Sequence, residues 1–296
     1  MKKVKFYGFK LLIAVSIVFM SAHAIGQKAP ERVEPPFWWS GMYHQELQIK
    51  VYAPNIGTTR VKIDHPGIVL KEVVAVESPN YLFLYLDISN AKPGNFKIDF
   101  VSGRRTLYSH TYELRQRKDN ARYIKGFDNS DAIYLLMPDR FANGDPTNDN
   151  VAGMRENTDR SNPDGRHGGD IQGIINHLDY IKNMGFTAIW PNPLIENDQP
   201  RYSYHGYAAT DFYNIDARFG GNEAFLRLAA EAEKRGIKII KDKILNHCGH
   251  YHWWIKDLPS KDWLNHWPEF TRTTYRMPTI LDPHRSEERR VGEECR

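Results

Sequence analysis

The chain has 296 residues, of which 41% are hydrophobic and 12% aromatic. This composition is typical of a globular protein with room for one large domain or two ordinary ones, and it excludes a disordered chain. The formal net charge of +4 equals the charge of the four lysines among the first ten residues, so the rest of the chain is nearly neutral. Such a chain offers no long-range electrostatic reason to expect nucleic acid or an anionic membrane as a partner.

The first 26 residues have the pattern of a cleaved export signal. Lysines precede an apolar run over residues 11–20, and Ala22 and Ala24 give the small-x-small pattern of a cleavage site. A membrane anchor is the alternative, but this run is too short to cross about 30 Å of hydrocarbon. We therefore expect residues 1–26 to be removed and the protein to be exported, periplasmic or secreted, with no membrane anchoring after cleavage.

Residues 27–120 are expected to form a β-sandwich module. Apolar and polar residues alternate over four segments that are separated by turns rich in proline, glycine and asparagine. The four segments are residues 46–52, 60–63, 81–86 and 96–100. Alternation of period two with such turns favours an antiparallel sandwich of the immunoglobulin-like type. Trp38 and Trp39 suit core packing better than an exposed stacking platform for a ligand, because paired tryptophans bury a large apolar area.

Residues 121–284 show a different periodicity. Strands are expected over 131–137, 186–190 and 237–242, and helices over 170–184 and 222–235. This alternation of strand and helix is the opening of a parallel α/β domain. Three strands before His284 are too few to close an eight-stranded (β/α)8 barrel of about 250 residues. The predicted fold is therefore a β-sandwich followed by an incomplete (β/α)8 barrel of the α/β class.

The last residues of the chain, 285–296, have neither a helical apolar stripe nor strand alternation. They closely resemble the translation of a common sequencing adapter, so we expect a non-native tail, with an ordinary solvated charged tail as the alternative. Cys295 lies in this tail, which would leave Cys248 without a disulfide partner.

An oxygen-rich turn follows the first expected strand of the α/β region. Asn-Gly-Asp-Pro-Thr-Asn-Asp-Asn occupies residues 143–150, and Gly168 and Asp170 stand before the next expected helix. Calcium takes six to eight oxygen ligands in irregular geometry, so such a turn suits it better than magnesium. Ordinary turn chemistry, with Asp170 as a helix N-cap, explains the same residues. Both interpretations stay open on the residues alone.

Tryptophans and histidines gather after the third expected strand, in residues 250–267. They could line a ligand-binding surface, but packing of a loop-rich segment is at least as good an explanation. His250 and His252 have no third ligand at convincing spacing, which argues against a zinc site.

Four sequence motifs resemble parts of one enzyme family. Lys-Asp-Lys-Ile-Leu-Asn-His at 241–247 resembles the first conserved region of the α-amylase superfamily. Residues 204–213 and 218–220 resemble the substrate-side loop after the second barrel strand, and both regions fall at strand ends where a barrel keeps its active site. Residues 33–42 resemble the amino-terminal module of cyclomaltodextrinases and neopullulanases. Over about residues 31–284, the chain is thus similar to neopullulanase-like and cyclomaltodextrinase-like members of glycoside hydrolase family 13.

The resemblance implies roles for five residues near a bound sugar. Tyr207 matches the aromatic residue that stacks on the glucose next to the scissile bond, and His247 matches the histidine that hydrogen-bonds this glucose. Asp242 matches a carboxylate that braces the site from beneath, with Asn246 as a structural partner. His205, in the same motif as Tyr207, is expected to contact substrate as well.

The resemblance also implies a calcium cofactor. Its ligands would be Asn143, Asp145, Asn148, Asp149, the Gly168 carbonyl and Asp170.

The activity implied by the resemblance is hydrolysis of α-1,4 linkages in maltooligosaccharides, cyclodextrins or pullulan with retention, which uses two carboxylates about 5–5.5 Å apart. In the family, these carboxylates follow later barrel strands, so we expect the nucleophile and the acid/base beyond His284 and no hydrolysis by this chain. The complete enzyme could form a homodimer through the sandwich. The alternative function is a non-catalytic glucan-binding protein that uses only the sandwich and the aromatic residues.

Lys243 departs from the family pattern, which usually has an apolar residue at this strand position. A buried lysine costs several kcal/mol unless it is paired or neutral. We therefore expect either a carboxylate partner for Lys243 or unusual packing of this strand.

Overall fold

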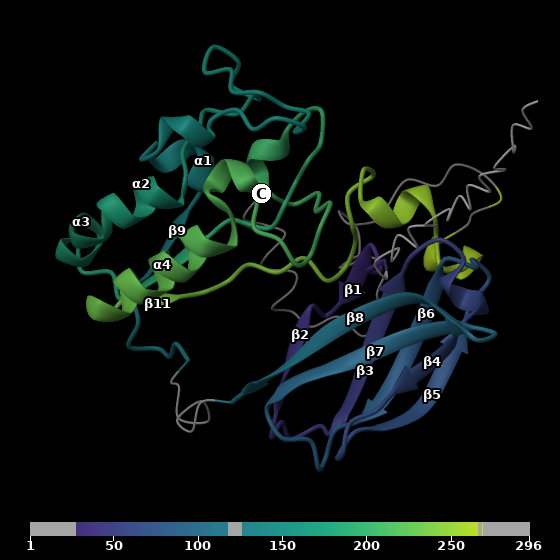
Figure 1. The fold of residues 1–296 in the computed structure, drawn as a ribbon. Helices are drawn as coiled ribbons and strands as arrows, with labels where there is room; N and C mark the ends of the chain where they lie inside the picture. The colour runs from purple at the N-terminus through teal and green to yellow at the C-terminus, as the bar shows by residue number, and fades with distance from the viewer. Residues whose placement is uncertain (1–27, 118–125, 266–267, 269–296) are drawn as a thin grey trace, which may run out of the picture.

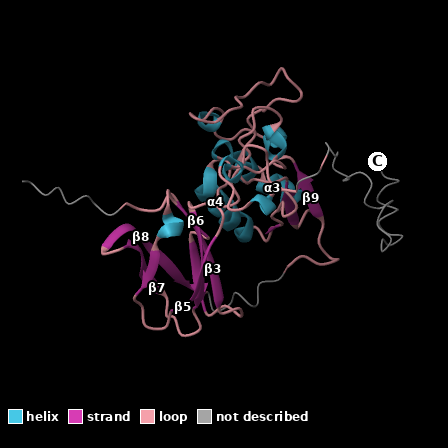
Figure 2. Cartoon of the chain, turned by 90° about the vertical axis from the view of Figure 1, so that its right-hand side faces the viewer, coloured by secondary structure: helices cyan, strands magenta, loops and turns pink. Residues whose placement is uncertain are grey.

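A computed structural model describes residues 28–117, 126–265 and 268 (Figure 1). The expected export signal and the expected adapter-derived tail lie outside these residues. Two regions are present, a sandwich made of strands and a region in which helices accompany a small sheet, and Figure 2 distinguishes them by colour. None of the helices in the described ranges is both long and apolar enough to span a bilayer.

The sandwich consists of two four-stranded sheets. One sheet has the order β1-β3-β6-β5, and the other has the order β2-β8-β7-β4. The strands of the first sheet are β1 (Arg32–Glu34), β3 (Glu46–Tyr52), β6 (Tyr81–Asp87) and β5 (Val69–Ala75). Those of the second sheet are β2 (Phe37–Ser40), β8 (Arg105–Gln116), β7 (Gly94–Ser102) and β4 (Arg60–Ile63).

The expected antiparallel pairing holds except at one edge. β2 pairs in parallel with β8, with Phe37 opposite Glu113. Pro35 and Pro36 lie between β1 and β2, where the chain passes from one sheet to the other. Because proline has no N–H to donate to a ladder, the chain leaves the first sheet at these residues. The predicted sandwich is therefore present, and its pairing departs from the expected antiparallel pattern only at this edge strand, among the described strands.

The core of the sandwich follows the period of two that the sequence shows. Ile49 of β3, Leu84 of β6 and Ile98 of β7 are fully buried, and their neighbours along each strand alternate toward the outer face. Burial of each such side chain contributes about 1.5–3 kcal/mol. Trp38 packs against this core, as expected. Trp39, the next residue along the strand, makes an edge contact with Phe37 instead, with ring centroids 5.2 Å apart.

The second region contains a parallel sheet with the order β11-β10-β9. Its strands are β9 (Ile133–Leu136), β10 (Ala188–Pro191) and β11 (Lys238–Ile239). Its helices are α1 (Pro138–Phe141), α2 (Ile171–Asn176), α3 (Leu178–Asn183) and α4 (Gly221–Lys234). This alternation confirms the predicted opening of a (β/α)8 barrel.

Two elements of this region differ from the prediction. The helix expected over 170–184 is two helices, because His177 leaves helical geometry at φ −113° and ψ 9° and its Nδ1 lies 2.8 Å from the Gly173 carbonyl oxygen. The strand expected over 237–242 pairs only through Lys238 and Ile239. The apolar stripe was nevertheless identified correctly, since Ile171, Ile174, Leu178 and Ile181 are fully buried.

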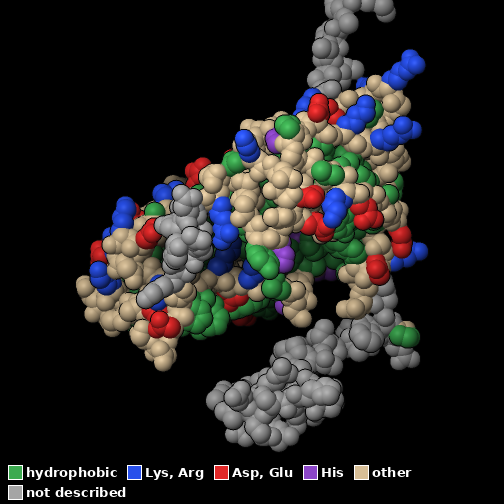
Figure 3. All heavy atoms as spheres, turned by 90° about the horizontal axis from the view of Figure 1, so that it is seen from below, with side chains coloured by type: hydrophobic (Ala, Val, Ile, Leu, Met, Phe, Trp, Pro, Cys, Tyr) green, Lys and Arg blue, Asp and Glu red, His purple; other side chains and the backbone are tan. Residues whose placement is uncertain are grey.

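The segment after β11 runs back onto the sandwich. It forms two short 3-10 helices, Trp253–Lys256 and Lys261–Trp263, drawn in yellow-green in Figure 1 beside the sandwich. Basic and acidic side chains are interspersed over the face of the molecule in Figure 3, in keeping with the nearly neutral composition.

Candidate substrate and metal sites

The expected sugar-contacting residues meet at the ends of β10 and β11. The Tyr207 hydroxyl donates to Asp242 Oδ2 over 3.1 Å, and the Trp190 indole N–H donates to the same oxygen over 3.2 Å. His247 Nε2 lies 2.8 Å from the Tyr207 carbonyl oxygen, which requires a proton on Nε2. Residues far apart in the sequence thus form one constellation around Tyr207.

The backbone before Tyr207 is fixed by His205 and Gly206. The Tyr207 N–H donates to His205 Nδ1 over 2.9 Å, so this nitrogen is unprotonated. Burial lowers the pKa of His205, which favours the same neutral form. Gly206 has φ +81°, and a β-carbon there would collide with the Pro193 carbonyl. Only glycine fits this turn without strain.

The side chain of Tyr207 is partly exposed, although its hydroxyl is hydrogen-bonded to Asp242. The residue is 40% exposed. Partial burial, together with the hydrogen bond to Asp242 and its negative charge, raises the pKa of Tyr207. The hydroxyl therefore stays protonated and continues to donate to Asp242.

Asn246 and Lys243 both line a cavity of about 650 Å³ between the sandwich and the α/β region. The side chains of both residues are exposed. The expected burial penalty for Lys243 does not arise, because β11 ends before it at Ile239. The structural role expected for Asn246 stays a prediction, since no hydrogen bond of its side chain is present among the described residues.

Trp190 is a member of the constellation that the sequence motifs did not reveal. It stands in β10 and is 40% exposed on the face opposite the buried Ile189. A tryptophan near the carboxyl end of a barrel strand is a signal that could have identified it, because those ends carry active-site side chains.

The oxygen-rich turn brings most of the expected calcium ligands together. Asn143 Nδ2 donates to Asp149 Oδ1 over 2.6 Å, and Asn148 Nδ2 donates to Asp170 Oδ2 over 3.0 Å. Gly168 lies against this group with φ +84°, so close that a β-carbon there would lie 2.6 Å from Asp149 Oδ1. Five of the six expected ligands are thus neighbours.

Asp145 and Asp170 also serve as local caps. Asp145 Oδ1 accepts from the Thr147 N–H over 3.1 Å, so its carboxylate is turned toward its own 3-10 helix. Asp170 Oδ1 accepts from the Gly173 N–H over 2.6 Å at the start of α2. The N-cap interpretation of Asp170 is therefore confirmed, and its second oxygen remains directed toward the turn.

Two amide oxygens of this donor set are unpaired and face no hydrogen-bond donor. Asn143 Oδ1 and Asn148 Oδ1 are buried and have no hydrogen-bond partner. A buried oxygen without a partner costs about 1–3 kcal/mol, and here two of them adjoin two carboxylates. No cluster of three or more histidine, cysteine, aspartate or glutamate side chains suited to a metal occurs in the described ranges. The unpaired oxygens of Asn143 and Asn148 are nevertheless ligands of the kind that calcium takes.

Two buried carboxylates, Asp139 and Asp216, hold the loops that carry these sites. Asp139 accepts from the His167 N–H over 2.8 Å and from the Gly168 N–H over 3.2 Å, which fixes Gly168 beside the turn. Arg218 makes two hydrogen bonds to Asp216, at 2.9 Å and 2.8 Å. Burial alone would raise the pKa of Asp216, but the bonds to Arg218 hold it below its usual value. Arg218 of the expected substrate-side motif is thus a structural residue.

Two protein families match the chain. The family described as α-amylase, catalytic domain, matches residues 135–289, and the family described as cyclomaltodextrinase, N-terminal, matches residues 32–118. The β/α-amylase of Paenibacillus polymyxa is 48% identical over 122 residues, which cover 40% of this chain and 10% of that protein. The cyclomaltodextrinase of Thermoanaerobacter pseudethanolicus is 35% identical over 170 residues, covering 50% and 28%. Neopullulanase 2 of Thermoactinomyces vulgaris is 39% identical over 130 residues, covering 44% and 22%.

Solved structures of related enzymes match over a similar share. The Anoxybacillus α-amylase is 42% identical with a TM-score of 0.43, covering 50% of this chain and 31% of that chain. The cyclic maltosyl-maltose hydrolase of Arthrobacter globiformis is 42% identical with a TM-score of 0.37, covering 43% and 28%. The chain spans between 10% and 28% of the length of the three relatives above. Because the catalytic-domain match covers just over half of its residues, the chain belongs to the α-amylase family.

Proposed function

We propose that this chain is part of an α-glucan hydrolase that acts on α-1,4 linkages of maltooligosaccharides, cyclodextrins or pullulan with retention. The observation that carries the proposal is the meeting of Tyr207, Asp242 and His247 at the carboxyl ends of two neighbouring parallel strands. Relatives named cyclomaltodextrinase and neopullulanase support the same substrate class.

Three hydrogen bonds fix the position of Tyr207. Its hydroxyl is bound to Asp242, its N–H to His205 and its carbonyl to His247. A ring oriented before the ligand arrives loses little conformational freedom on binding. Tyr207 would stack on the apolar face of a glucose, and the neighbouring His247 would hydrogen-bond the hydroxyls of the same sugar.

Asp242 has a supporting role in this proposal. One of its oxygens already accepts from both Tyr207 and Trp190, so it orients these side chains. Retention needs a nucleophile and an acid/base about 5–5.5 Å apart across one glycosidic bond. We propose that both come from barrel strands beyond His284, so that this chain by itself releases no reducing sugar from maltoheptaose.

Calcium is proposed as the cofactor. Asn143, Asn148, Asp149 and Asp170 would hold it through side-chain oxygens, together with the Gly168 carbonyl and, after rotation of its side chain, Asp145. The ion would supply positive charge between two carboxylates and join the loop after β9 to the start of α2.

Export to the periplasm or medium is proposed as well, and a relative named periplasmic α-amylase from Escherichia coli supports it. A homodimer through the sandwich stays a prediction.

Binding of maltoheptaose to the full chain, measured by isothermal titration calorimetry, tests the proposal without requiring turnover. Tyr207→Ala should weaken binding by about tenfold or more, because a stacked aromatic ring contributes on the order of 1–3 kcal/mol. Tyr180→Ala is the matched control, since Tyr180 is an exposed tyrosine on α3. Absence of binding by the wild-type chain, or equal affinities of the two variants, would refute the assigned site.

A further inference from the structure

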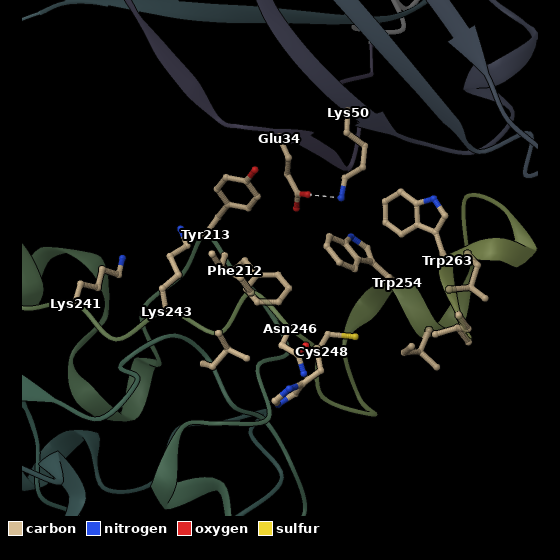
Figure 4. Close-up of a pocket in the computed structure, with 16 residues that line it drawn as sticks. Glu34, Lys50, Phe212, Tyr213, Lys241, Lys243, Asn246, Cys248, Trp254 and Trp263 are labelled. Carbon is tan, nitrogen blue, oxygen red and sulfur yellow. Dashed lines mark ion pairs between the residues drawn. The ribbon is translucent and has the colours of Figure 1, made fainter. Parts of the chain in front are cut away.

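Lys50 is a buried lysine at the place where the sandwich meets the segment after β11. Its Nζ lies 2.7 Å from Glu34 Oε2, and neither side chain is more than 10% exposed. The same Nζ lies over three tryptophan rings, with centroids at 4.1 Å for Trp254, 4.9 Å for Trp253 and 5.6 Å for Trp263. We call these three rings the tryptophan cage. Figure 4 shows Lys50 and Glu34 pointing from the sandwich toward two of these rings, Trp254 and Trp263.

The cage replaces the water that Lys50 loses. Burial lowers the pKa of Lys50, and the neighbouring Glu34 carboxylate opposes this effect. An ammonium group removed from water needs a counter-charge and further favourable contacts, and the faces of tryptophan rings attract a cation. In the docked arrangement, Lys50 therefore has the Glu34 carboxylate and the three rings in place of water.

A second set of contacts holds the same segment to the sandwich. Asp257 Oδ1 accepts from the Ser78 hydroxyl over 2.9 Å, and Asp257 Oδ2 accepts from Asn80 Nδ2 over 2.6 Å. The Tyr81 hydroxyl donates to the Asp257 carbonyl over 2.6 Å, and the Ser78 N–H donates to the Pro259 carbonyl over 2.9 Å. The segment is therefore also bound to the sandwich directly after its first 3-10 helix.

The docked segment is continuous with the candidate sugar site. Gly249 follows His247 by two residues, and its N–H donates to the carbonyl of Ala209, which follows Tyr207 by two residues, over 2.7 Å. His247 itself bonds to the Tyr207 carbonyl. The two strand-end loops are therefore tied together immediately before the chain enters the cage.

The sandwich also reaches the loop of Tyr207 directly. Arg32 Nη1 of β1 lies 2.6 Å from Asp211 Oδ2, and Asp211 is buried. The next residue of this loop, Phe212, packs on Trp254 with ring centroids 5.6 Å apart. Both loops of the sugar site thus converge on the same end of the sandwich.

We propose that Lys50 is a positioning residue for glucan binding. Through Glu34 and the tryptophan cage, it docks the sandwich on the segment after β11 and thereby sets the relative positions of Tyr207 and His247. Lys50 lies in the amino-terminal module and touches neither residue, so it acts through the cage. This inference rests on the proposed function, because it concerns the geometry of the same sugar site.

The experiment compares three variants of the full chain. Lys50→Met keeps an unbranched side chain of similar length without the charge, and Lys50→Arg keeps a cation that can lie on an aromatic ring. Lys71→Met is the matched control, because Lys71 pairs with Glu46 over 3.3 Å on the same sandwich and both side chains are exposed. Maltoheptaose affinity is measured by calorimetry, and exposure of the tryptophans is measured by acrylamide quenching of their fluorescence.

Lys50→Met should weaken maltoheptaose binding about five- to tenfold and increase quenching, because a displaced segment misaligns the two contact residues. Lys50→Arg should stay within about twofold of wild type, and Lys71→Met should change neither measurement. A folded Lys50→Met chain with wild-type affinity would overturn the proposal.

Asp257→Ala serves as a second variant in case Lys50→Met does not fold. It removes the acceptor of Ser78 and Asn80 without leaving a buried charge unpaired, and it should also weaken binding and raise quenching. Wild-type affinity for Asp257→Ala would count against the positioning role. If the wild-type chain itself binds no maltoheptaose, the proposed function fails and the role of Lys50 fails with it. Weaker binding by Lys50→Met and Asp257→Ala, with near wild-type binding by Lys50→Arg and Lys71→Met, supports both the proposed function and the role of Lys50.

Discussion

The sandwich and the α/β region differ in how completely they cover their own strands. Leu84, in the middle of β6, is fully buried between the two sheets of the sandwich. In β9, Leu136 is buried beneath the helices, but its neighbour Leu135 is 59% exposed on the other face of the sheet. β10 shows the same contrast between the buried Ile189 and the exposed Trp190.

The exposed face of the three-stranded sheet is the one that carries the candidate site. Trp190 lies on this face and bonds to Asp242, which in turn bonds to Tyr207. In a closed barrel, this face is the interior, filled by side chains from all the strands. The comparison suggests that the sandwich can fold from its own contacts, whereas the α/β region relies on contacts from outside its sheet. Its docking on the sandwich through Asp257 and Lys50 is one such source.

The largest expected effect is the difference in stability lost when one leucine in each region is replaced by alanine. Leu84→Ala should lower the free energy of unfolding by about 2–5 kcal/mol, because it leaves a cavity in a closed core. Leu135→Ala should cost less than about 1 kcal/mol, because this side chain is already largely in water. Urea unfolding followed by circular dichroism measures both. Equal losses would contradict the contrast drawn between the regions.

A second prediction concerns pH at the contact between the regions. His252 is 1% exposed, its Nε2 has no partner, and burial lowers its pKa to about 4. Asp211 opposes this shift, while Lys50 and Arg32 add to it. An unfolded histidine titrates near 6.5, so between about pH 6.5 and pH 4 only the unfolded state takes up this proton. The free energy of unfolding should therefore fall by roughly 3 kcal/mol as the pH is lowered through this window, with no contribution above it.

The difference between wild type and His252→Asn isolates this histidine from the other titrating groups. Between pH 7.5 and pH 4, the free energy of unfolding of wild type should fall by roughly 3 kcal/mol relative to that of His252→Asn, whatever their difference at pH 7. Parallel curves would show that His252 titrates normally in the folded chain.

Removal of calcium should act on one region only. If calcium is bound at about 100 times its dissociation constant, chelation should remove about 2.7 kcal/mol of stability. Differential scanning calorimetry should show EDTA lowering the transition of the α/β region and leaving that of the sandwich unchanged. Asp149→Ala should abolish this sensitivity, and Asp164→Ala, at an exposed aspartate of the following loop, should retain it. Wild-type melting that is insensitive to EDTA would exclude the cofactor.

The sequence predicted strands well where alternation was regular. Residues 46–52 and 60–63 coincide with β3 and β4. β5 was missed because most of its side chains are exposed and its pairing with β6 shifts register between Leu70 and Glu72, which interrupts the period of two. β11 was predicted too long because apolar character alone does not show where pairing with a neighbour stops.

The site residues that carry a local motif were identified, and those defined by distant contacts were not. Tyr207, Asp242 and His247 stand in short motifs, and the fold brings them together. Trp190 depends on its position relative to Asp242, which is 52 residues away. Lys50 depends on tryptophans more than 200 residues later in the chain. No local sequence pattern indicates such contacts between residues that are distant in the chain.

The smallest expected effect tests whether Trp190 belongs to the site or only packs beside it. Trp190→Phe keeps an aromatic ring on the exposed face of β10 but removes the N–H that donates to Asp242 Oδ2 over 3.2 Å. One hydrogen bond contributes about 0.5–1.5 kcal/mol, so maltoheptaose should bind about two- to tenfold more weakly. The temperature of the thermal unfolding transition of the sandwich should not change. Tyr207→Phe removes the second donor to the same oxygen. Because the two donors share one acceptor, their effects should not add in the double variant, and calorimetry of the four proteins measures this coupling. Additive losses, or wild-type affinity for Trp190→Phe, would leave Trp190 as a packing residue and Asp242 oriented by Tyr207 alone.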